Sequence, residues 1–167
     1  LATLAERRGV RIHELYGDLP AEEQDAVLRP GDRRKVILAT NVAETSVTVE
    51  GVTAVVDSGL ARRSRFDASV GLDRLELVRI SRSSADQRTG RAGRTQPGIC
   101  LRLWTEGVQR SLSDEDEPEI RRVDLAAPAL QLLAFGERDP RAFPWFEAPP
   151  AVALDTALVL LTRLGAI

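Results

Sequence analysis

Short apolar runs alternate with polar segments that contain proline or glycine along most of this chain. Residues 35–39 and 52–56 are two such runs, and each has the length and composition of a strand buried in a parallel sheet. Residues 21–28 follow Pro20 and have the composition of a helix that ends near Pro30. This alternation of strands and helices predicts an α/β fold built on a parallel sheet.

Two other parts of the chain depart from that alternation. In residues 60–79, arginines and polar residues alternate with leucines around a short turn, which predicts an antiparallel β-hairpin. Residues 125–135 and 152–164 predict two apolar helices, each followed by a glycine, and an acidic segment with the composition of a solvated linker precedes them. We therefore expect one domain over residues 1–112 and a smaller one over residues 113–167.

Charge and composition narrow the classes of function. The chain has 23 basic and 25 acidic residues, yet residues 51–112 contain 11 arginines against 6 acidic residues. Positive charge gathered on one segment is what a phosphate-binding surface requires. No run is long enough to span a bilayer and the start is not signal-like, so we expect a soluble, cytoplasmic protein without a membrane partner. The single Cys100 and the single His13 make a disulfide and a metal site unexpected.

Residues 87–94 read QRTGRAGR and fall within residues 83–93, which predict a helix, before a strand predicted over residues 99–103. Arginines recur at every third position, and glycines precede two of them. Guanidinium groups suit phosphate oxygens, and glycines let the backbone come close to a ligand. The pattern indicates a site for a triphosphate or its transition state. The alternative is a solvated, arginine-rich helix start without a ligand.

This octet resembles motif VI of the superfamily 2 helicases. Residues 39–49, ATNVAETSVTV, resemble motif V in its DEAH-box form, and residues 15–20, LYGDLP, resemble the segment after motif IV. Further segments resemble the HrpB-type DEAH helicases; they are residues 91–100, 103–104, 118–120, 144–145 and 148–150. The resemblance implies a RecA-like parallel sheet flanked by helices with an inserted β-hairpin, followed by a small helical, winged-helix segment.

The resemblance also implies roles in ATP hydrolysis. Gln87 would orient the attacking water, and Arg91 and Arg94 would reach the γ-phosphate as arginine fingers, an effect typically worth about 10³–10⁵ in rate. The residues expected close to the nucleotide are Glu44, Asp57 and Gly90. Arg88 is kept out of the catalytic set, because its position favours pairing with a carboxylate that braces the motif.

Motif V and the hairpin are expected to bind single-stranded RNA or DNA through the phosphate backbone. The residues implied are Thr40, Asn41, Thr45, Ser46, Arg62, Arg63 and Arg65. Thr45 and Ser46 have an alternative role as a helix cap, and the hairpin arginines have one as a charged edge that prevents pairing between sheets. The choice of RNA over DNA rests on the resemblance alone.

The 167 residues contain neither a GxxxxGK[ST] phosphate loop nor a DEAH tetrad. By the resemblance, motif IV would precede Leu1, and the N-terminal RecA-like domain of the same protein would hold most of the Mg²⁺ ligands. We expect the chain alone neither to bind ATP tightly nor to hydrolyse it. An incomplete sheet would also expose an edge, which predicts self-association or marginal stability.

Two alternatives to an ATP-dependent helicase remain open. A non-catalytic nucleic-acid-binding module would bind in a salt-dependent way that ATP does not alter. A regulatory or assembly fragment would have its hairpin arginines paired with carboxylates and not facing solvent.

Overall fold

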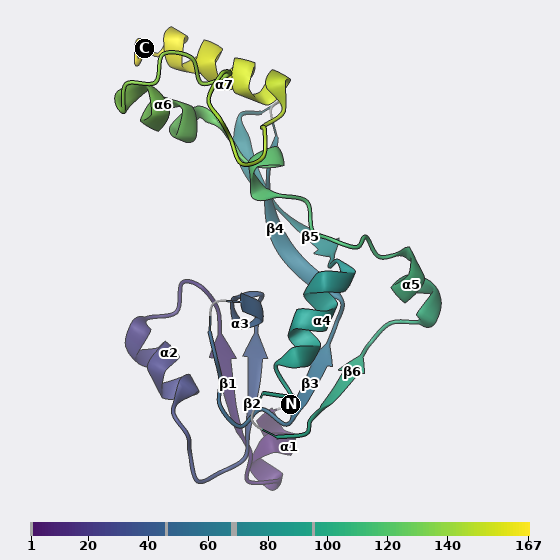
Figure 1. Cartoon of the computed structure of the whole chain (residues 1–167). Coiled ribbons are helices and arrows are strands. Elements are labelled where there is room, and N and C mark those ends of the chain that lie inside the picture. The colour runs from purple at the N-terminus through teal and green to yellow at the C-terminus, as the bar shows by residue number, and fades with distance from the viewer. Residues whose placement is uncertain (1, 46, 68–69, 95) are drawn as a thin grey trace. The chain divides into compact units, whose positions relative to one another are not determined.

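The computed structural model of the chain describes residues 2–45, 47–67, 70–94 and 96–167 (Figure 1). They form two compact units. The first unit consists of Leu1–Arg62 and Leu77–Asp116, and the second of Arg63–Glu76 and Glu117–Ile167. Each unit has its own buried core. The domain boundary expected at residue 112 stays a prediction.

Two pairs of parallel strands form the framework of the first unit. β1 (Arg11–Leu15) lies parallel to β2 (Lys35–Ala39), with Arg11 opposite Lys35 and Leu15 opposite Ala39. β3 (Ala54–Asp57) lies parallel to β6 (Ile99–Arg102). The helix α2 (Ala21–Leu28) connects β1 to β2, as a parallel pair requires a crossover. The predicted α/β fold with parallel strands is confirmed.

Helices pack against these strands. α1 (Ala2–Arg7) contacts β1, and α4 (Arg82–Gly90) contacts both β3 and α3 (Val42–Thr45). Figure 1 shows α4 running alongside β3. Two small cores result; their buried members are Leu15, Leu19 and Val27 in one, and Ala61, Ile80 and Ala85 in the other. The position of α4 is therefore set by packing on the sheet and on α3.

One face of the β3–β6 pair is not covered by the described residues. Val56, Ile99 and Leu101 are each more than half exposed, although all three are large and apolar. An uncovered apolar face of this kind favours association with another chain or segment. The self-association expected from the sequence stays a prediction.

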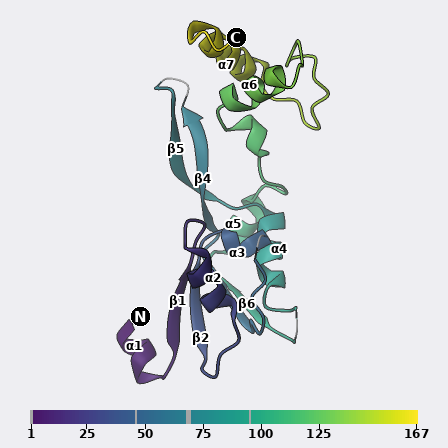
Figure 2. The same cartoon turned by 90° about the vertical axis from the view of Figure 1, so that its left-hand side faces the viewer.

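The predicted β-hairpin is present. β4 (Leu60–Asp67) and β5 (Leu72–Arg79) pair in a two-stranded sheet, and a four-residue connection joins only antiparallel neighbours (Figure 2). Within the second unit, the amide of Phe66 donates to the carbonyl of Arg122 at 2.7 Å, and the Arg122 guanidinium donates to the carbonyl of Ser64 at 2.7 Å. The distal part of the hairpin thus packs with the segment that leads into the C-terminal helices.

The second unit contains the two predicted apolar helices, α6 (Ala126–Ala134) and α7 (Ala151–Arg163), after the 3-10 turn η1 (Glu119–Arg121). Both helices lie within one residue of their predicted bounds. Their shared core consists of Leu125, Ala129, Leu154, Ala157, Leu158 and Leu161. Burial of each leucine contributes about 1.5–3 kcal/mol, which makes this helix pair the main source of stability in the unit. Within the described part of the chain, no helix is long and apolar enough to cross a membrane.

Two short helices were not predicted. α3 is a single turn, and α5 (Glu106–Ser111) has six residues, so neither is long enough to show an apolar period. α5 did carry one local signal, since the Thr105 hydroxyl accepts from the Val108 amide at 3.3 Å as an N-cap.

Candidate functional site

The arginine-rich octet begins in α4 and continues into a tightened turn. After Gly90 the amide of Arg91 donates to the carbonyl of Arg88 at 3.1 Å, and that of Ala92 donates to Thr89 at 3.1 Å. A turn with three residues per repeat places side chains three positions apart on the same side. The three-residue spacing of the arginines therefore aligns all three, and all three contact residues 44–60 of the same unit.

Arg88 makes the most buried of these contacts. Its Nε donates to Glu44 Oε2 at 2.9 Å, and its Nη1 donates to Asp57 Oδ1 at 2.9 Å. The side chains of Arg88, Glu44 and Asp57 are 15%, 13% and 1% exposed. Burial lowers the pKa of Arg88, but the hydrogen bonds and charges of the two carboxylates outweigh it and raise that pKa above its ordinary value. Arg88 therefore stays charged and ties α3 and β3 to α4, as the sequence favoured.

We call Arg88, Glu44 and Asp57 the brace. Two further groups complete it: the Ser84 hydroxyl donates to Glu44 Oε1 at 2.6 Å, and the Gly59 amide donates to Asp57 Oδ1 at 2.9 Å. The predicted nucleotide roles of Glu44 and Asp57 stay predictions, and the structure gives both carboxylates a bracing contact as well. Asp57 Oδ2 is buried and has no hydrogen-bond partner among the described residues.

Ser84 was missed by sequence reasoning. It lies four positions before Arg88, so both side chains fall on one face of α4 and reach the same carboxylate. The four-residue spacing of Ser84 and Arg88 was the available signal in the sequence. It indicates a shared partner only when Glu44 is known to lie opposite this face of α4.

Arg91 and Arg94 have partners of a different kind. Arg91 donates to the carbonyl oxygens of Glu44 and of Val47, the latter at 3.1 Å, and Arg94 donates to Thr48 Oγ1 at 2.5 Å. Among the described residues neither guanidinium forms an ion pair. Burial, and then the charge of Arg94, lower the pKa of Arg91. Two neighbouring positive charges are thus held in place by neutral oxygens, which leaves them able to attract an anion.

The other predicted residues of the octet are open to solvent. Gln87 is exposed on α4, one helical turn before Arg91. Gly90 and Gly93 do not have positive φ, and a Cβ built on either would meet no atom within 4 Å. Neither the backbone nor the packing of the described chain therefore requires glycine at these two positions. The space beside them is free for a ligand.

The predicted nucleic-acid contacts fall in two places. Thr40 and Asn41 follow β2 with exposed side chains, close in sequence to the carbonyls that hold Arg91. Arg62 is exposed, whereas Arg65, in the second unit, pairs with Glu76 at 3.3 Å and with Glu117 at 2.9 Å. Arg63 is partly buried. Ser46 and the side chain of Thr45 lie outside the described residues.

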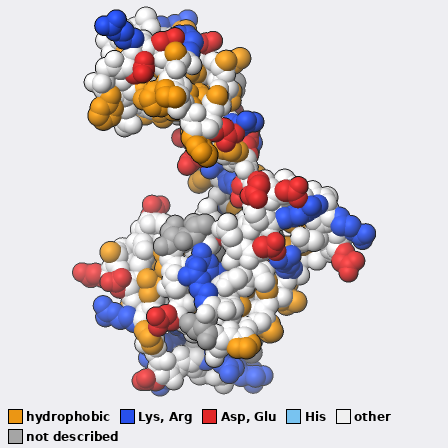
Figure 3. Space-filling model, in the orientation of Figure 1, with side chains coloured by type: hydrophobic (Ala, Val, Ile, Leu, Met, Phe, Trp, Pro, Cys, Tyr) orange, Lys and Arg blue, Asp and Glu red, His pale blue; other side chains and the backbone are white. Residues whose placement is uncertain are grey.

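The positive segment does not form a uniformly basic surface. Several of its arginines pair with carboxylates; they are Arg65, Arg74, Arg82, Arg88, Arg102 and Arg110. Figure 3 shows basic and acidic side chains interspersed on the face of the first unit that it draws. The uncompensated charge of Arg91 and Arg94 is therefore a local feature of the site and not of the whole segment.

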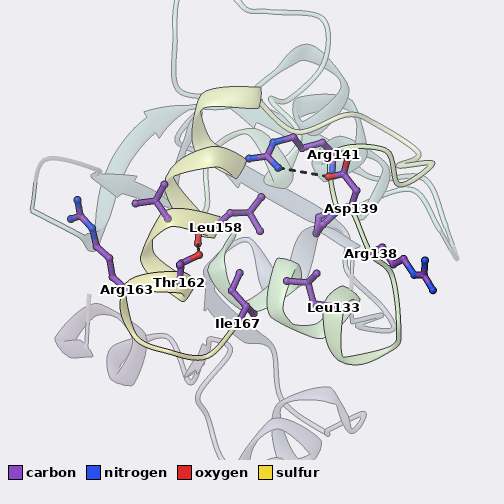
Figure 4. A pocket seen from close by; sticks show the side chains of 10 residues that line it. Leu133, Arg138, Asp139, Arg141, Leu158, Thr162, Arg163 and Ile167 are labelled. Atoms are coloured by element: carbon purple, nitrogen blue, oxygen red, sulfur yellow. Dashed lines mark hydrogen bonds and ion pairs between the residues drawn. The ribbon is translucent and has the colours of Figure 1, made fainter.

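A hollow of about 490 Å³ lies between α6 and α7 in the second unit. Figure 4 shows Leu133, Leu158 and Ile167 turned toward its interior, with Arg138 and Arg163 pointing outward. None of the predicted site residues lines it. The described residues also place no group of three His, Cys, Asp or Glu side chains where they would jointly hold a metal ion.

The parallel strand pairs, the hairpin and the braced arginine turn together define a helicase domain. The chain belongs to the family of the helicase conserved C-terminal domain, whose family model matches residues 1–96. The resemblance to DEAH-box and HrpB-type helicases is confirmed by similar proteins of that type. The chain is 44% identical over 98% of its length to the ATP-dependent RNA helicase HrpB of Escherichia coli, and 44% identical over 92% to the probable ATP-dependent RNA helicase DHX34 of Mus musculus.

A crystal structure of the Escherichia coli DEAH/RHA helicase HrpB matches 99% of the chain with a TM-score of 0.88 at 43% sequence identity. The chain spans 22% of that structure, 21% of the curated HrpB sequence and 14% of mouse DHX34. It therefore corresponds to one portion of much longer helicases.

Proposed function

We propose that this chain is the part of a DEAH-type RNA helicase that supplies motifs V and VI to ATP hydrolysis and to movement along RNA. Arg91 and Arg94 stabilise the negative charge that develops on the phosphoryl group, and Gln87 orients the attacking water. ATP, when bound, supplies the phosphoryl group that is transferred. A fixed guanidinium needs no reorganisation to stabilise such charge, so this kind of contact raises the rate by about 10³–10⁵.

The observation that carries this proposal is the setting of Arg91 and Arg94. Both lie side by side without a carboxylate partner among the described residues, next to glycines that leave open space. Arg88, by contrast, is paired with two carboxylates. A triphosphate fits this arrangement, because it supplies the missing negative charge and needs a close approach to the backbone.

The remaining roles complete the proposal. Thr40, Asn41 and Arg62 contact the phosphate backbone of single-stranded RNA, and their side chains are exposed in a manner that supports this role. Magnesium is held mainly by residues of an N-terminal RecA-like domain, which also contributes the rest of the ATP site. The choice of RNA follows the names of the similar helicases. The partner domain rests on the motif resemblance, and a cytoplasmic location is proposed from the sequence alone.

The test is ATP hydrolysis after mixing the chain with a separately produced N-terminal RecA-like domain, with and without single-stranded RNA. We expect RNA-stimulated turnover that Arg91→Ala or Arg94→Ala reduces by about 10³-fold or more. Arg138→Ala is the matched control, because Arg138 is an exposed arginine of the second unit outside the proposed site.

An assembled mixture whose turnover is indifferent to both arginines would contradict the catalytic roles. RNA binding that falls with salt and ignores ATP would then favour a non-catalytic binding module. The assembly alternative predicted paired hairpin arginines, and Arg65 has that feature while Arg62 is exposed. Loss of RNA binding in Arg62→Ala would count against it.

A further inference from the structure

The acidic segment of residues 113–116 is bound to the first turn of α4. From its composition it was expected to be a solvated linker; Ser113, Asp114 and Glu115 are exposed, and the segment also has hydrogen-bonded partners that composition did not indicate. The amide of Arg82 donates to the carbonyl of Ser113 at 2.8 Å, and that of Ser83 donates to the carbonyl of Asp114 at 3.0 Å. The amide of Ser81 donates to Asp116 Oδ1 at 3.0 Å. Local composition could not reveal these contacts, because the two segments are more than thirty positions apart.

Side chains strengthen this attachment. Arg82 donates to Asp114 Oδ1 at 2.7 Å and to the carbonyl of Arg110 at 2.7 Å. The fourth amide at this end, that of Ser84, donates to the N-cap oxygen of Ser81 at 3.1 Å. A helix start leaves several amides without a partner inside the helix, and negative groups are favoured there. Residues 113–116 satisfy both requirements.

Two segments therefore hold α4. Residues 113–116 bind its first turn, and the brace reaches the first turn through Ser84 and the last turn through Arg88. Arg91 and Arg94 follow directly, in a turn that is hydrogen-bonded to the end of the helix. A shift of α4 along its axis would move both guanidinium groups relative to any phosphate that they contact.

We infer that Asp114 and Asp116 are positioning residues, which hold α4 at its first turn and thereby set the placement of Arg91 and Arg94. Neither aspartate needs to touch the nucleotide. The inference deepens the proposed function and rests on it, because the placement of these arginines affects turnover only if they act on ATP. Its structural part, the control of α4 by the acidic segment, can be measured without ATP.

The experiment compares three variants of the chain. Asp114→Ala with Asp116→Ala removes the two carboxylate acceptors and leaves the backbone carbonyls of Ser113 and Asp114 in place. Asp114→Asn with Asp116→Asn keeps a side-chain acceptor oxygen at each position, and Glu115→Ala is the matched control. Glu115 is an exposed acidic residue in the same run, and its loss removes one negative charge while leaving the hydrogen bonds of Asp114 and Asp116 to α4 in place. Amide hydrogen exchange in residues 81–90 and NMR signals of the Arg91 and Arg94 guanidinium groups are recorded on the chain alone.

We expect the double alanine variant to speed exchange in the first turns of α4 about tenfold and to shift both arginine signals, while the asparagine and Glu115→Ala variants resemble the unchanged chain. In the mixture with the N-terminal domain, the double alanine variant lowers kcat about tenfold with KM for ATP unchanged, and the asparagine variant restores kcat.

Unchanged exchange and arginine signals in the double alanine variant would overturn the inference. So would faster exchange with unchanged kcat, because the segment would then stabilise the helix without positioning the arginines. Absence of turnover in the unchanged mixture would instead count against the proposed function, and the exchange and NMR results would still decide whether the segment controls α4.

Discussion

The last turn of α4 and the turn that follows it present arginines in opposite settings. Arg88 is mostly buried and pairs with two carboxylates, whereas the hydrogen-bond partners of Arg91 and Arg94 among the described residues are carbonyl and hydroxyl oxygens. The same side-chain chemistry, at a constant spacing of three residues, therefore serves two purposes. A carboxylate partner neutralises the guanidinium and fixes the fold; a neutral partner fixes the guanidinium and leaves its charge available.

Motif V (residues 39–49) provides partners for arginines in both settings. Motif V contributes the carboxylate of Glu44 to the brace, and its backbone carbonyls from Glu44 and Val47 to Arg91. A single short segment thus contacts α4 through Arg88 and sets the direction of the Arg91 guanidinium. Any change in motif V, for example on binding a nucleic acid at Thr40 or Asn41, would reach Arg91 through these carbonyls.

The strongest test of the comparison is removal of Arg88. Arg88→Ala leaves Glu44 and Asp57 charged, mostly buried and without their cation, so we expect the free energy of unfolding to fall by about 3–5 kcal/mol. Arg91→Ala removes hydrogen bonds to neutral oxygens only and should cost about 1 kcal/mol. Urea denaturation of the two variants measures the contrast, and equal losses would contradict it.

A neutral version of the brace provides the control. When Arg88→Met is combined with Glu44→Gln and Asp57→Asn, no charge is left unpaired, so most of the stability lost in Arg88→Ala should return. Recovery would assign the loss to unpaired carboxylates. Failure to recover would assign it to packing of the arginine stem, and the distinction between the two arginine settings would then lose its electrostatic basis.

The sequence predicted the elements of the fold because each carried a local signal. Pro20 introduces α2, a short apolar run forms β2, and the apolar period gives α6 and α7 within a residue. The hydrogen-bonded partners of the octet carried no such signal. Arg88 meets Asp57 across 31 positions of sequence and Glu44 across 44. Such pairs depend on how β3, α3 and α4 pack, which periodicity does not encode.

The acidic segment of residues 113–116 is a second case in which local sequence did not predict the contacts. Its composition is that of a solvated run, and Asp114 and Glu115 are indeed exposed. Backbone amides at the start of α4 hold this segment in place. Because almost every residue carries such an amide, the sequence contains no signal for these contacts. The resemblance to helicases located the octet well, but its residue roles at the nucleotide stay predictions until turnover is measured.

A second test, with a smaller expected effect, uses Gly59, which donates a hydrogen bond to the brace. Gly59 donates its amide to Asp57, has φ of +73°, and a Cβ there would lie 2.8 Å from Cε3 of Trp104. Gly59→Ala should therefore lower the free energy of unfolding by about 1–3 kcal/mol, from backbone strain and overpacking together. Thermal denaturation measures the loss. An unchanged midpoint would show that the brace tolerates movement at Asp57.

The smallest effect on stability is expected for Gly90, which borders open space. Gly90 ends α4 without positive φ and without a neighbour in the space that a Cβ would fill. Gly90→Ala should leave stability unchanged or raise it by about 0.5 kcal/mol, since alanine is the better helix former. Turnover in the reconstituted mixture should nevertheless fall if the phosphate lies in the open space beside Gly90, because the methyl group would occupy that space. A variant that is more stable and less active would show that glycine at position 90 is required by the ligand and not by the fold. Full activity in Gly90→Ala would mean that the open space beside the arginines is not where the phosphate lies.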